Sequence, residues 1–196
     1  MKSYLTHLEC TYCGETLSAD EPRRLCPSCG KVLYARYDLA AARNGFDRRT
    51  LTGRAANMWR YFEVLPVVDA NNVVTLGEGF TPIHRAERLG AEIGAENLLV
   101  KDEGVNPTAT FKARGLSAAV SKALELGVTK VTLPSAGTAG GALASYAARA
   151  GIEAHIFMPQ DAPEATMKEV ATSGAHLTLV DGLINEAGRQ SREKAE

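Results

Sequence analysis

Residues 128–158 read VTKVTLPSAGTAGGALASYAARAGIEAHIFM, and this stretch decides the fold. It predicts an apolar strand at 128–133, an alanine-rich helix at 140–150 and a second strand at 153–158. Outward from it, the pattern predicts further strands at 97–101 and 176–180, and helices at 111–126 and from 183 onward. Strands that alternate with helices indicate right-handed β-α-β units, a parallel sheet and therefore an α/β protein.

A further helix is expected to begin near Pro163, with Asp161 as its cap and Glu164 three residues later. In parallel sheets, ligands bind beyond the carboxyl ends of the strands. The loops at 102–115 and 134–141 are therefore the places where functional residues are expected.

The first of these loops leads into a helix whose first turn carries Lys112 beside Phe111. A nucleophilic lysine needs its neutral amine, which burial or a neighbouring cation such as Arg114 favours. The alternative is an ordinary surface lysine. The second loop, PSAGTAGG, consists of small residues whose backbone N–H groups can bind an anion at a helix start, or it is only a tight turn. It matches neither the GxGxxG dinucleotide motif nor the GxxxxGK[ST] nucleotide motif.

All four cysteines lie within the first thirty residues, as two C-x₂-C pairs separated by twelve residues: Cys10, Cys13, Cys26 and Cys29. This spacing predicts a tetrahedral Zn²⁺ site with four thiolate ligands. A segment of about forty residues has too small a core to fold alone, and a bound metal would supply the missing free energy. Two disulfides or free structural thiols are the alternatives, and His7 is a nearby further ligand candidate.

The composition indicates a globular protein, with 45% hydrophobic residues, 23% charged residues and a formal net charge of −1. Residues 1–60 carry ten Lys or Arg against six Asp or Glu, and residues 61–196 carry twelve against seventeen, so the N-terminal region is net positive and the rest net negative. The near-neutral balance argues against a chain devoted to nucleic acid, although a zinc-ribbon module that binds nucleic acid or protein is the alternative from another class. No run is long enough for a membrane helix and no secretory signal is evident, so a cytoplasmic location is expected.

Residues 38–65 are expected to be mostly helical, broken at Gly45 and Gly53. This connector contains the only tryptophan, Trp59, within a run of bulky rings that is expected to anchor the connector to the core of the body.

Four segments resemble, in order, motifs of the fold-type II pyridoxal-phosphate enzymes, and most closely those of the threonine synthase group. Residues 58–66 (MWRYFEVLP) are similar to its WRY…LP segment, and residues 76–82 (LGEGFTP) to its LGEG-x-TP segment. Residues 106–112 (NPTATFK) are similar to the cofactor-lysine motif, and residues 135–140 (SAGTAG) to the loop that holds the substrate carboxylate. An N-terminal zinc-ribbon-like segment also occurs in part of this group.

The resemblance implies the open, layered parallel sheet of the tryptophan synthase β-like fold. It implies a lyase that uses pyridoxal 5′-phosphate to convert O-phosphohomoserine to threonine and phosphate, with a homodimeric full-length enzyme. Lys112 would be the catalytic residue that holds the cofactor, Thr138 would face the oxygen on the cofactor ring, and Ser135, Ala136 and Gly137 would hold the substrate carboxylate. A related serine/threonine dehydratase or β-replacement synthase is the alternative within the same family.

The chain departs from the family pattern at four positions near these motifs. Thr138 stands where asparagine is usual, Ala139 where threonine is frequent, Ala109 where glycine is usual and Ala113 where aspartate is frequent. Family members are also about twice as long, and no phosphate-cradling loop of the family's kind follows the lysine. We therefore expect a zinc ribbon at 1–37, a helical connector at 38–66 and the N-terminal part of a catalytic domain at 67–196, which is inactive when alone.

Overall fold

The centre of the body is a three-stranded parallel sheet in a computed structural model that describes residues 1–195. Its strands lie in the order β6 (Lys130–Pro134), β7 (Glu153–Pro159) and β8 (His176–Val180). The predicted parallel sheet is thus confirmed for these three strands. The last four residues of the central strand β7 are all buried, because both faces of the sheet are covered.

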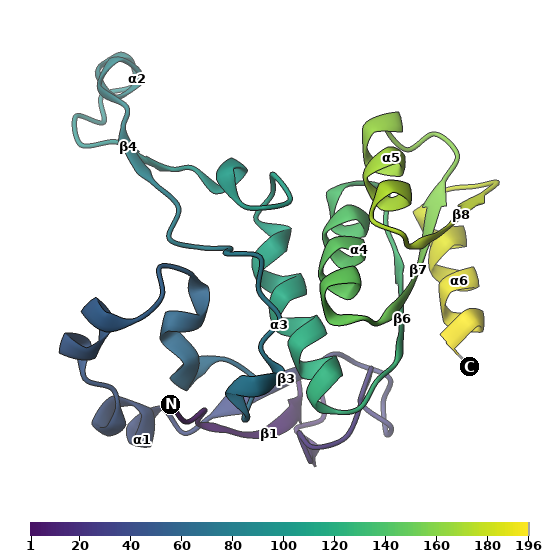
Figure 1. The fold of residues 1–196 in the computed structure, drawn as a ribbon, viewed down its shortest axis with the longest axis horizontal. Coiled ribbons are helices and arrows are strands. Elements are labelled where there is room, and N and C mark those ends of the chain that lie inside the picture. Colours follow the sequence, from purple (N-terminus) through teal and green to yellow (C-terminus); the bar gives the residue numbers. More distant parts are fainter. Residues whose placement is uncertain (196) are drawn as a thin grey trace.

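Helices cover the sheet on both faces (Figure 1). On one face lie α4 (Thr138–Ala150), which connects β6 to β7, and α5 (Glu164–Thr172), which connects β7 to β8. On the other face, α6 (Ile184–Ala195) packs against β6 and β7. The alanine and glycine content of α4 permits close packing: a Cβ added at Gly140 would lie 3.0 Å from the Ile156 side chain.

Helix α3 (Lys112–Glu125) packs against α4 and completes the main core. The core joins apolar side chains of α3, α4, α5 and the sheet, and its fully buried members include Val120, Tyr146, Ile156, Met158 and Val170. Burial of such side chains stabilises a fold by about 1.5–3 kcal/mol each. The lysine-bearing helix is therefore fixed to the sheet through α4.

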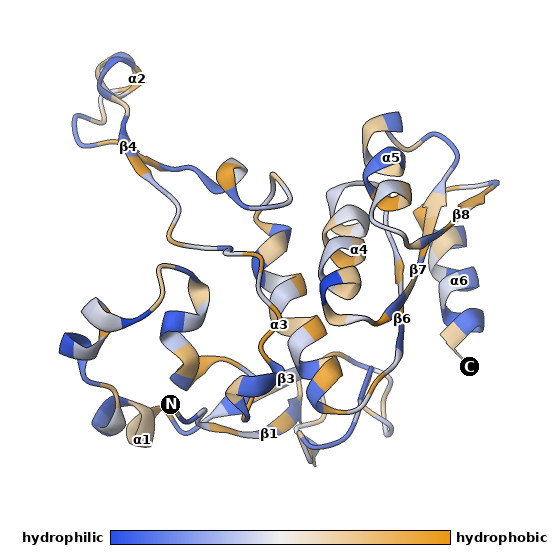
Figure 2. Cartoon of the chain, viewed as in Figure 1, coloured by the Kyte–Doolittle hydropathy of each residue, from blue (hydrophilic) through white to orange (hydrophobic). Residues whose placement is uncertain are grey.

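One predicted strand does not belong to this sheet. Residues 99–101 form β5 (Leu99–Lys101), which pairs antiparallel with β4 (Ile83–Arg85) around the short helix α2 (Glu87–Glu92). The prediction that 97–101 is a strand of the parallel sheet is therefore wrong. Every residue of both strands is exposed, so no apolar face draws them to the core, and the hairpin extends as an arm (Figure 1). Hydrophobic residues occur along this arm (Figure 2), and Ile83, Leu89 and Leu99 among them are exposed.

The expected cap at Asp161 is also wrong. Helix α5 begins at Glu164, the residue before it is Pro163, and no side chain caps its first turn. A turn closed by the Ala162 N–H and the Pro159 carbonyl oxygen, 3.1 Å apart, separates Asp161 from the helix start.

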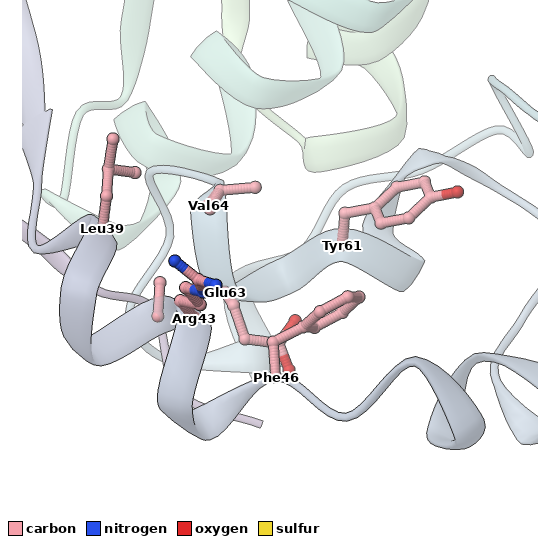
Figure 3. A pocket seen from close by; sticks show the side chains of 7 residues that line it. Leu39, Arg43, Phe46, Tyr61, Glu63 and Val64 are labelled. Carbon is pink, nitrogen blue, oxygen red and sulfur yellow. The ribbon is translucent and has the colours of Figure 1, made fainter.

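The connector is helical in short pieces. Helix α1 (Leu39–Gly45) is capped by Asp38, whose carboxylate accepts from the Ala41 N–H at 2.8 Å. Two 3₁₀ helices follow within the connector, Arg48–Gly53 and Met58–Val64, and a third, Ala70–Asn72, lies just after it. The predicted breaks at Gly45 and Gly53 are confirmed, and both residues end a helix. A cavity of about 250 Å³ lies within the connector (Figure 3). It is lined by residues of α1, by Phe46 and by Tyr61, Glu63 and Val64 of the second 3₁₀ helix.

The N-terminal segment forms a small antiparallel sheet in which β1 (Leu5–Cys10) lies between β2 (Thr16–Leu17) and β3 (Leu33–Tyr37). Hydrogen bonds attach it to the connector, among them those from the Tyr4 N–H to the Glu63 carbonyl oxygen and from the Ser3 hydroxyl to the Leu65 carbonyl oxygen. The predicted anchoring role of Trp59 is confirmed, because Trp59 is buried in a cluster with Met58, Phe62 and Val67 that packs on α3. Within residues 1–195, no helix has both the length and the apolar character needed to span a membrane.

Candidate functional site

The four cysteines meet at one end of the N-terminal sheet. Their sulfur atoms lie within 4.8 Å of one another, with Sγ–Sγ distances of 3.4 Å for Cys10–Cys29 and 3.6 Å for Cys13–Cys26. Tetrahedral Zn–S bonds of about 2.3 Å require sulfur separations of roughly 3.8 Å, so the cluster has the dimensions of a metal site. No disulfide joins these cysteines, and His7 is not part of the cluster.

Two glycines allow the chain to turn tightly at this cluster. Gly14 and Gly30 follow Cys13 and Cys29 and have φ of 73° and 69°, in the left-handed region that glycine adopts without strain. Their N–H groups bond back to the carbonyl oxygens of Cys10 and Cys26. The local backbone therefore presents both cysteines of each pair on the same side.

Lys112 is the first residue of α3 and is half-buried. Its ammonium lies 4.1 Å from the centre of the Phe111 ring and makes no hydrogen bond or ion pair within residues 1–195. By contrast, the Lys101 ammonium donates to the Thr81 carbonyl oxygen at 2.8 Å, and the Lys122 ammonium pairs with Glu125 at 2.7 Å. The amine of Lys112 is thus free for chemistry in a way that these two amines are not.

Arg114, the predicted cationic neighbour of Lys112, forms an ion pair with Glu103. The Arg114 guanidinium forms two hydrogen bonds to the Glu103 carboxylate, of 2.6 and 2.7 Å, and contacts Thr81. Arg114, together with the Thr81 hydroxyl and the Asn106 amide, holds the pKa of Glu103 far below its usual value. The charge of Arg114 is therefore compensated, and the pair fixes the short helix Glu103–Val105 to the start of α3.

The buried Asn106 closes the loop in front of the lysine. Its side-chain oxygen accepts from the Gly79 N–H at 3.0 Å, and its amide donates to the carbonyl oxygen and the carboxylate of Glu103. The segment 76–82 is thereby attached to the segment 106–112, although more than twenty residues separate them along the chain.

The loops at 106–112 and 135–140 come together through two threonines. The Thr138 hydroxyl donates to the Thr110 hydroxyl at 3.3 Å, and the Thr110 hydroxyl accepts from the Lys112 N–H at 3.4 Å. Thr138 is exposed and Thr110 is buried. The structure therefore places the predicted cofactor-binding Thr138 one contact away from the backbone of Lys112.

Ser135 shapes the second loop from inside. Its buried hydroxyl accepts from the N–H groups of Gly137 and Gly140, at 3.2 and 3.0 Å, and contacts the Gly137 carbonyl oxygen. The Gly137 N–H is thus already used within the protein. By the geometry of a helix start, the N–H groups of Thr138 and Ala139 have no partner inside α4, and Ala136 and Thr138 are exposed beside them.

The loop before Lys112 has unmet hydrogen-bonding capacity. The Thr108 hydroxyl is buried and has no hydrogen-bond partner within residues 1–195. Ala109, which stands where the resembling family usually has glycine, has φ of 50°. A buried polar group without a partner costs free energy, and a polar ligand would relieve that cost. A free lysine amine and an unsatisfied hydroxyl in one loop fit a cofactor that carries an aldehyde and polar substituents.

Glu78 is a buried residue of this region that sequence reasoning missed. Its fully buried carboxylate accepts from Trp59 Nε1 at 3.0 Å, Ser117 Oγ at 2.6 Å and the Tyr146 hydroxyl at 2.6 Å. It also accepts from the Leu76 N–H and the Thr75 hydroxyl. Burial and the neighbouring carboxylate raise the pKa of Tyr146 well above its ordinary value. The only signal in the sequence was a charged residue between two glycines in the LGEG segment.

The arrangement agrees with comparisons to known proteins. Residues 74–196 match the profile of a family described as "Pyridoxal-phosphate dependent enzyme". A threonine synthase of Methanocaldococcus jannaschii is 40% identical over 151 residues, which cover 77% of this chain and 37% of that protein. A threonine synthase of Methanosarcina acetivorans is 37% identical over 184 residues, which cover 92% of this chain and 44% of that protein. The chain therefore spans about two fifths of the length of these curated relatives.

Solved structures agree on the fold. The chain is similar to maize serine racemase, with a TM-score of 0.52 and 28% identity over 58% of this chain and 34% of that one. It is also similar to an O-ureido-L-serine synthase, with a TM-score of 0.53 and 26% identity over 59% of this chain and 38% of that one. Because the family profile covers the parallel sheet, the lysine and both loops, the chain belongs to the pyridoxal-phosphate dependent enzyme family.

Proposed function

We propose that this chain carries the lysine-bearing part of a pyridoxal-phosphate lyase of the threonine synthase type, which converts O-phosphohomoserine to threonine and phosphate. The observation that carries the proposal is the unpaired amine of Lys112, a residue whose backbone N–H contacts Thr110, the hydroxyl partner of Thr138. The choice of substrate rests on the threonine synthase relatives, which are 36–41% identical to this chain.

Three segments divide the work. Residues 1–37 are a zinc ribbon, residues 38–66 a helical connector and residues 67–196 the N-terminal part of the catalytic domain. The four cysteines Cys10, Cys13, Cys26 and Cys29 hold a structural Zn²⁺, which their sulfur separations fit. The complete enzyme is a cytoplasmic homodimer, and nucleic acid is not a partner.

Lys112 holds the cofactor through its amine and is the catalytic base. When bound, the cofactor withdraws electrons from the reacting carbon atoms of the substrate. Displaced by the incoming substrate, the Lys112 amine takes a proton from the substrate carbon and returns it at a later step. The core contacts of α3 fix the backbone of Lys112 at the start of that helix.

The second loop positions both cofactor and substrate. Thr138 faces the oxygen on the cofactor ring, and the loop Ser135, Ala136 and Gly137 holds the substrate carboxylate. Since Ser135 occupies the Gly137 N–H, the free N–H groups of Thr138 and Ala139 supply donors to that carboxylate. Thr138 has a shorter side chain than the asparagine that the family usually has at this position. Because of this difference, other amino-acid substrates are tested beside O-phosphohomoserine.

The lysine assignment is tested by trapping. The chain is incubated with excess pyridoxal phosphate, reduced with borohydride and mapped by peptide mass spectrometry. The pyridoxyl group is expected on Lys112, absent from a Lys112→Ala variant and retained in the matched control Lys122→Ala. A label that stays on Lys101 or Lys122 in the Lys112→Ala variant at the wild-type level would refute the assignment.

The reaction is tested in a polypeptide in which this chain is extended to the full length of its threonine synthase relatives. Phosphate release from O-phosphohomoserine supports the threonine synthase reaction, whereas keto-acid release from serine or threonine supports the dehydratase alternative. The 196 residues alone should bind the cofactor weakly and release no phosphate, because a cofactor phosphate depends on several charge-assisted hydrogen bonds of about 1.5–3 kcal/mol each. Tight, stoichiometric binding with turnover would show that these residues hold a complete site.

A further inference from the structure

A second group of metal-ligating side chains lies away from the candidate active site. Glu153 and His155 are the first and third residues of β7, and His176 is the first residue of β8. The strand register pairs His155 with His176, and it pairs Glu153 with Lys130 at the start of β6. These residues are therefore at the amino ends of the strands, whereas Ser135 follows the carboxyl end of β6.

Both histidines direct Nε2 at one carboxylate oxygen. The distance to Glu153 Oε1 is 2.7 Å from His155 Nε2 and 3.8 Å from His176 Nε2. The two rings are stacked, with centroids 4.7 Å apart and an interplanar angle of 19°. Apart from the cysteine cluster, this is the other group within residues 1–195 whose metal-ligating atoms all lie within 4.8 Å of one another.

The distances suit a metal of tetrahedral preference. Bonds of about 2.0–2.2 Å to imidazole nitrogen and carboxylate oxygen place neighbouring ligand atoms roughly 3.3–3.5 Å apart. The two measured separations lie on either side of this value, so shifts of about 1 Å would give the right spacing to Oε1. One histidine ring must also turn out of the stacked arrangement, because an imidazole nitrogen binds a metal in the plane of its ring. Two imidazoles and one carboxylate form a ligand set typical of Zn²⁺ and neighbouring divalent transition metals.

The three side chains are partly accessible to solvent, and one of them, His155, is largely buried. His155 is anchored, with 15% of its side chain exposed, while His176 and Glu153 are 64% and 37% exposed. A cavity of about 100 Å³ borders Glu153 and His176 and leaves room for water as a further ligand. Lys130 pairs with the other carboxylate oxygen at 3.1 Å, which leaves Oε1 to the histidines.

We propose that Glu153, His155 and His176 form a second metal site, for a divalent transition-metal ion, at the edge of the parallel sheet opposite the candidate active site. The ion joins β7 to β8 and takes its remaining ligands from water. This site does not depend on the proposed catalytic function, because none of its residues belongs to the loops around Lys112.

The test uses tag-free protein that already holds one zinc ion per chain, titrated with Co²⁺ and, separately, with Zn²⁺. Four histidines in the chain make the readout specific: the ring signals of His155 and His176 should broaden in NMR spectra with Co²⁺, and those of His7 and His84 should not. The absence of a new thiolate-to-cobalt absorption band would show that the added ion has not entered the cysteine cluster.

Variants separate the site from general metal binding. His176→Ala removes an exposed ligand and should weaken Co²⁺ binding at least tenfold. The matched control His84→Gln removes an exposed histidine that lies 3.9 Å from Asp102, and it should bind Co²⁺ as the wild type does. Circular dichroism confirms that both variants are folded. Wild-type protein that binds no second ion, or equal binding by the two variants, would mean that the three residues form a hydrogen-bonded cluster only.

Discussion

Replacing Glu78 by alanine should destabilise the protein by about 3–5 kcal/mol, because it leaves buried donors without an acceptor and removes a fully buried side chain. The structure sets this magnitude. The buried Tyr146 hydroxyl and the part-buried Leu76 N–H have no other acceptor within residues 1–195, and a buried donor left unsatisfied costs about 1–3 kcal/mol. Trp59 and Ser117 are less affected, because Trp59 Nε1 also donates to Ser117 Oγ at 2.9 Å.

Glutamine at the same position should cost only about 1–2 kcal/mol. With its oxygen in the place of Oε2, it still accepts from Tyr146 and Leu76. With its amide in the place of Oε1, it donates to the Ser117 hydroxyl, which already has the Val74 carbonyl oxygen as an acceptor at 2.7 Å. The carboxylate thus acts mainly as an acceptor of fixed donors rather than as a charge.

Urea unfolding measures both variants, with zinc and cofactor concentrations held constant because bound ligands shift apparent stability. At a slope of about 2 kcal/mol/M, Glu78→Ala should lower the midpoint by about 1.5–2.5 M. A double-mutant cycle with Tyr146→Phe adds a sharper criterion: removing the hydroxyl should cost about 1 kcal/mol in wild type and nothing in Glu78→Ala. Equal costs in both backgrounds, or loss of less than 1 kcal/mol in Glu78→Ala, would refute the reasoning.

Four further outcomes follow from the same contacts. Gly79→Ala should lower the free energy of unfolding by about 2–3 kcal/mol in thermal unfolding, because Gly79 has φ of 93° and the new Cβ would lie 2.7 Å from the Met58 backbone nitrogen. The control Gly77→Ala, at φ of 96° but with no atom within 4 Å of the new Cβ, should lower it by only about 1 kcal/mol. Ala109→Gly should leave stability unchanged or raise it by up to about 1 kcal/mol in the same assay, because its φ of 50° suits glycine. Arg114 lowers the pKa of Glu103, so the ionised carboxylate stabilises the fold above its ordinary pKa of 4.5 and loses that effect as the pH falls below it. The difference in unfolding free energy between wild type and Glu103→Gln should therefore shrink below pH 4.5 in urea titrations. Chelation of the proposed zinc ion should remove the dispersed NMR amide signals of residues 5–37 while those of α3 to α6 remain, and retention of the former would contradict a metal-dependent ribbon.

The repeated pattern of the body was predictable because its elements are long and supported by local signals. The strand at 176–180 has the predicted bounds, and the helices at 112–125 and 138–150 differ from the predicted ones by one or two residues. The segment at 97–101 was not predictable in the same way. Three exposed residues carry no period that separates a strand of a parallel sheet from an antiparallel hairpin, and the partner at Ile83 decides between them.

The candidate site shows the same division. Lys112 and the loop at 135–140 could be singled out from the sequence because both resemble known motifs. The loop at 135–140 also follows a strand of the parallel sheet, whereas the strand before Lys112 belongs to the antiparallel hairpin. The partners of Arg114 and Glu78 could not, since they come from segments that only the folded chain brings together. The role of Ser135 was also hidden, because a serine in a small-residue loop does not reveal that its hydroxyl occupies the Gly137 N–H.

The strands of the N-terminal sheet pair only with one another, and this affects the order of events during synthesis. Its most distant paired residues are Leu5 and Tyr37, and all four thiols precede Tyr37. Lys112 is added 75 residues later, which at about 5–20 residues per second means about 4–15 seconds. The growing chain thus presents its thiols before Lys112, the proposed cofactor lysine, exists. On the proposed assignments, a shortage of metal would act on the nascent chain, whereas a shortage of cofactor would act only after Lys112 has been added.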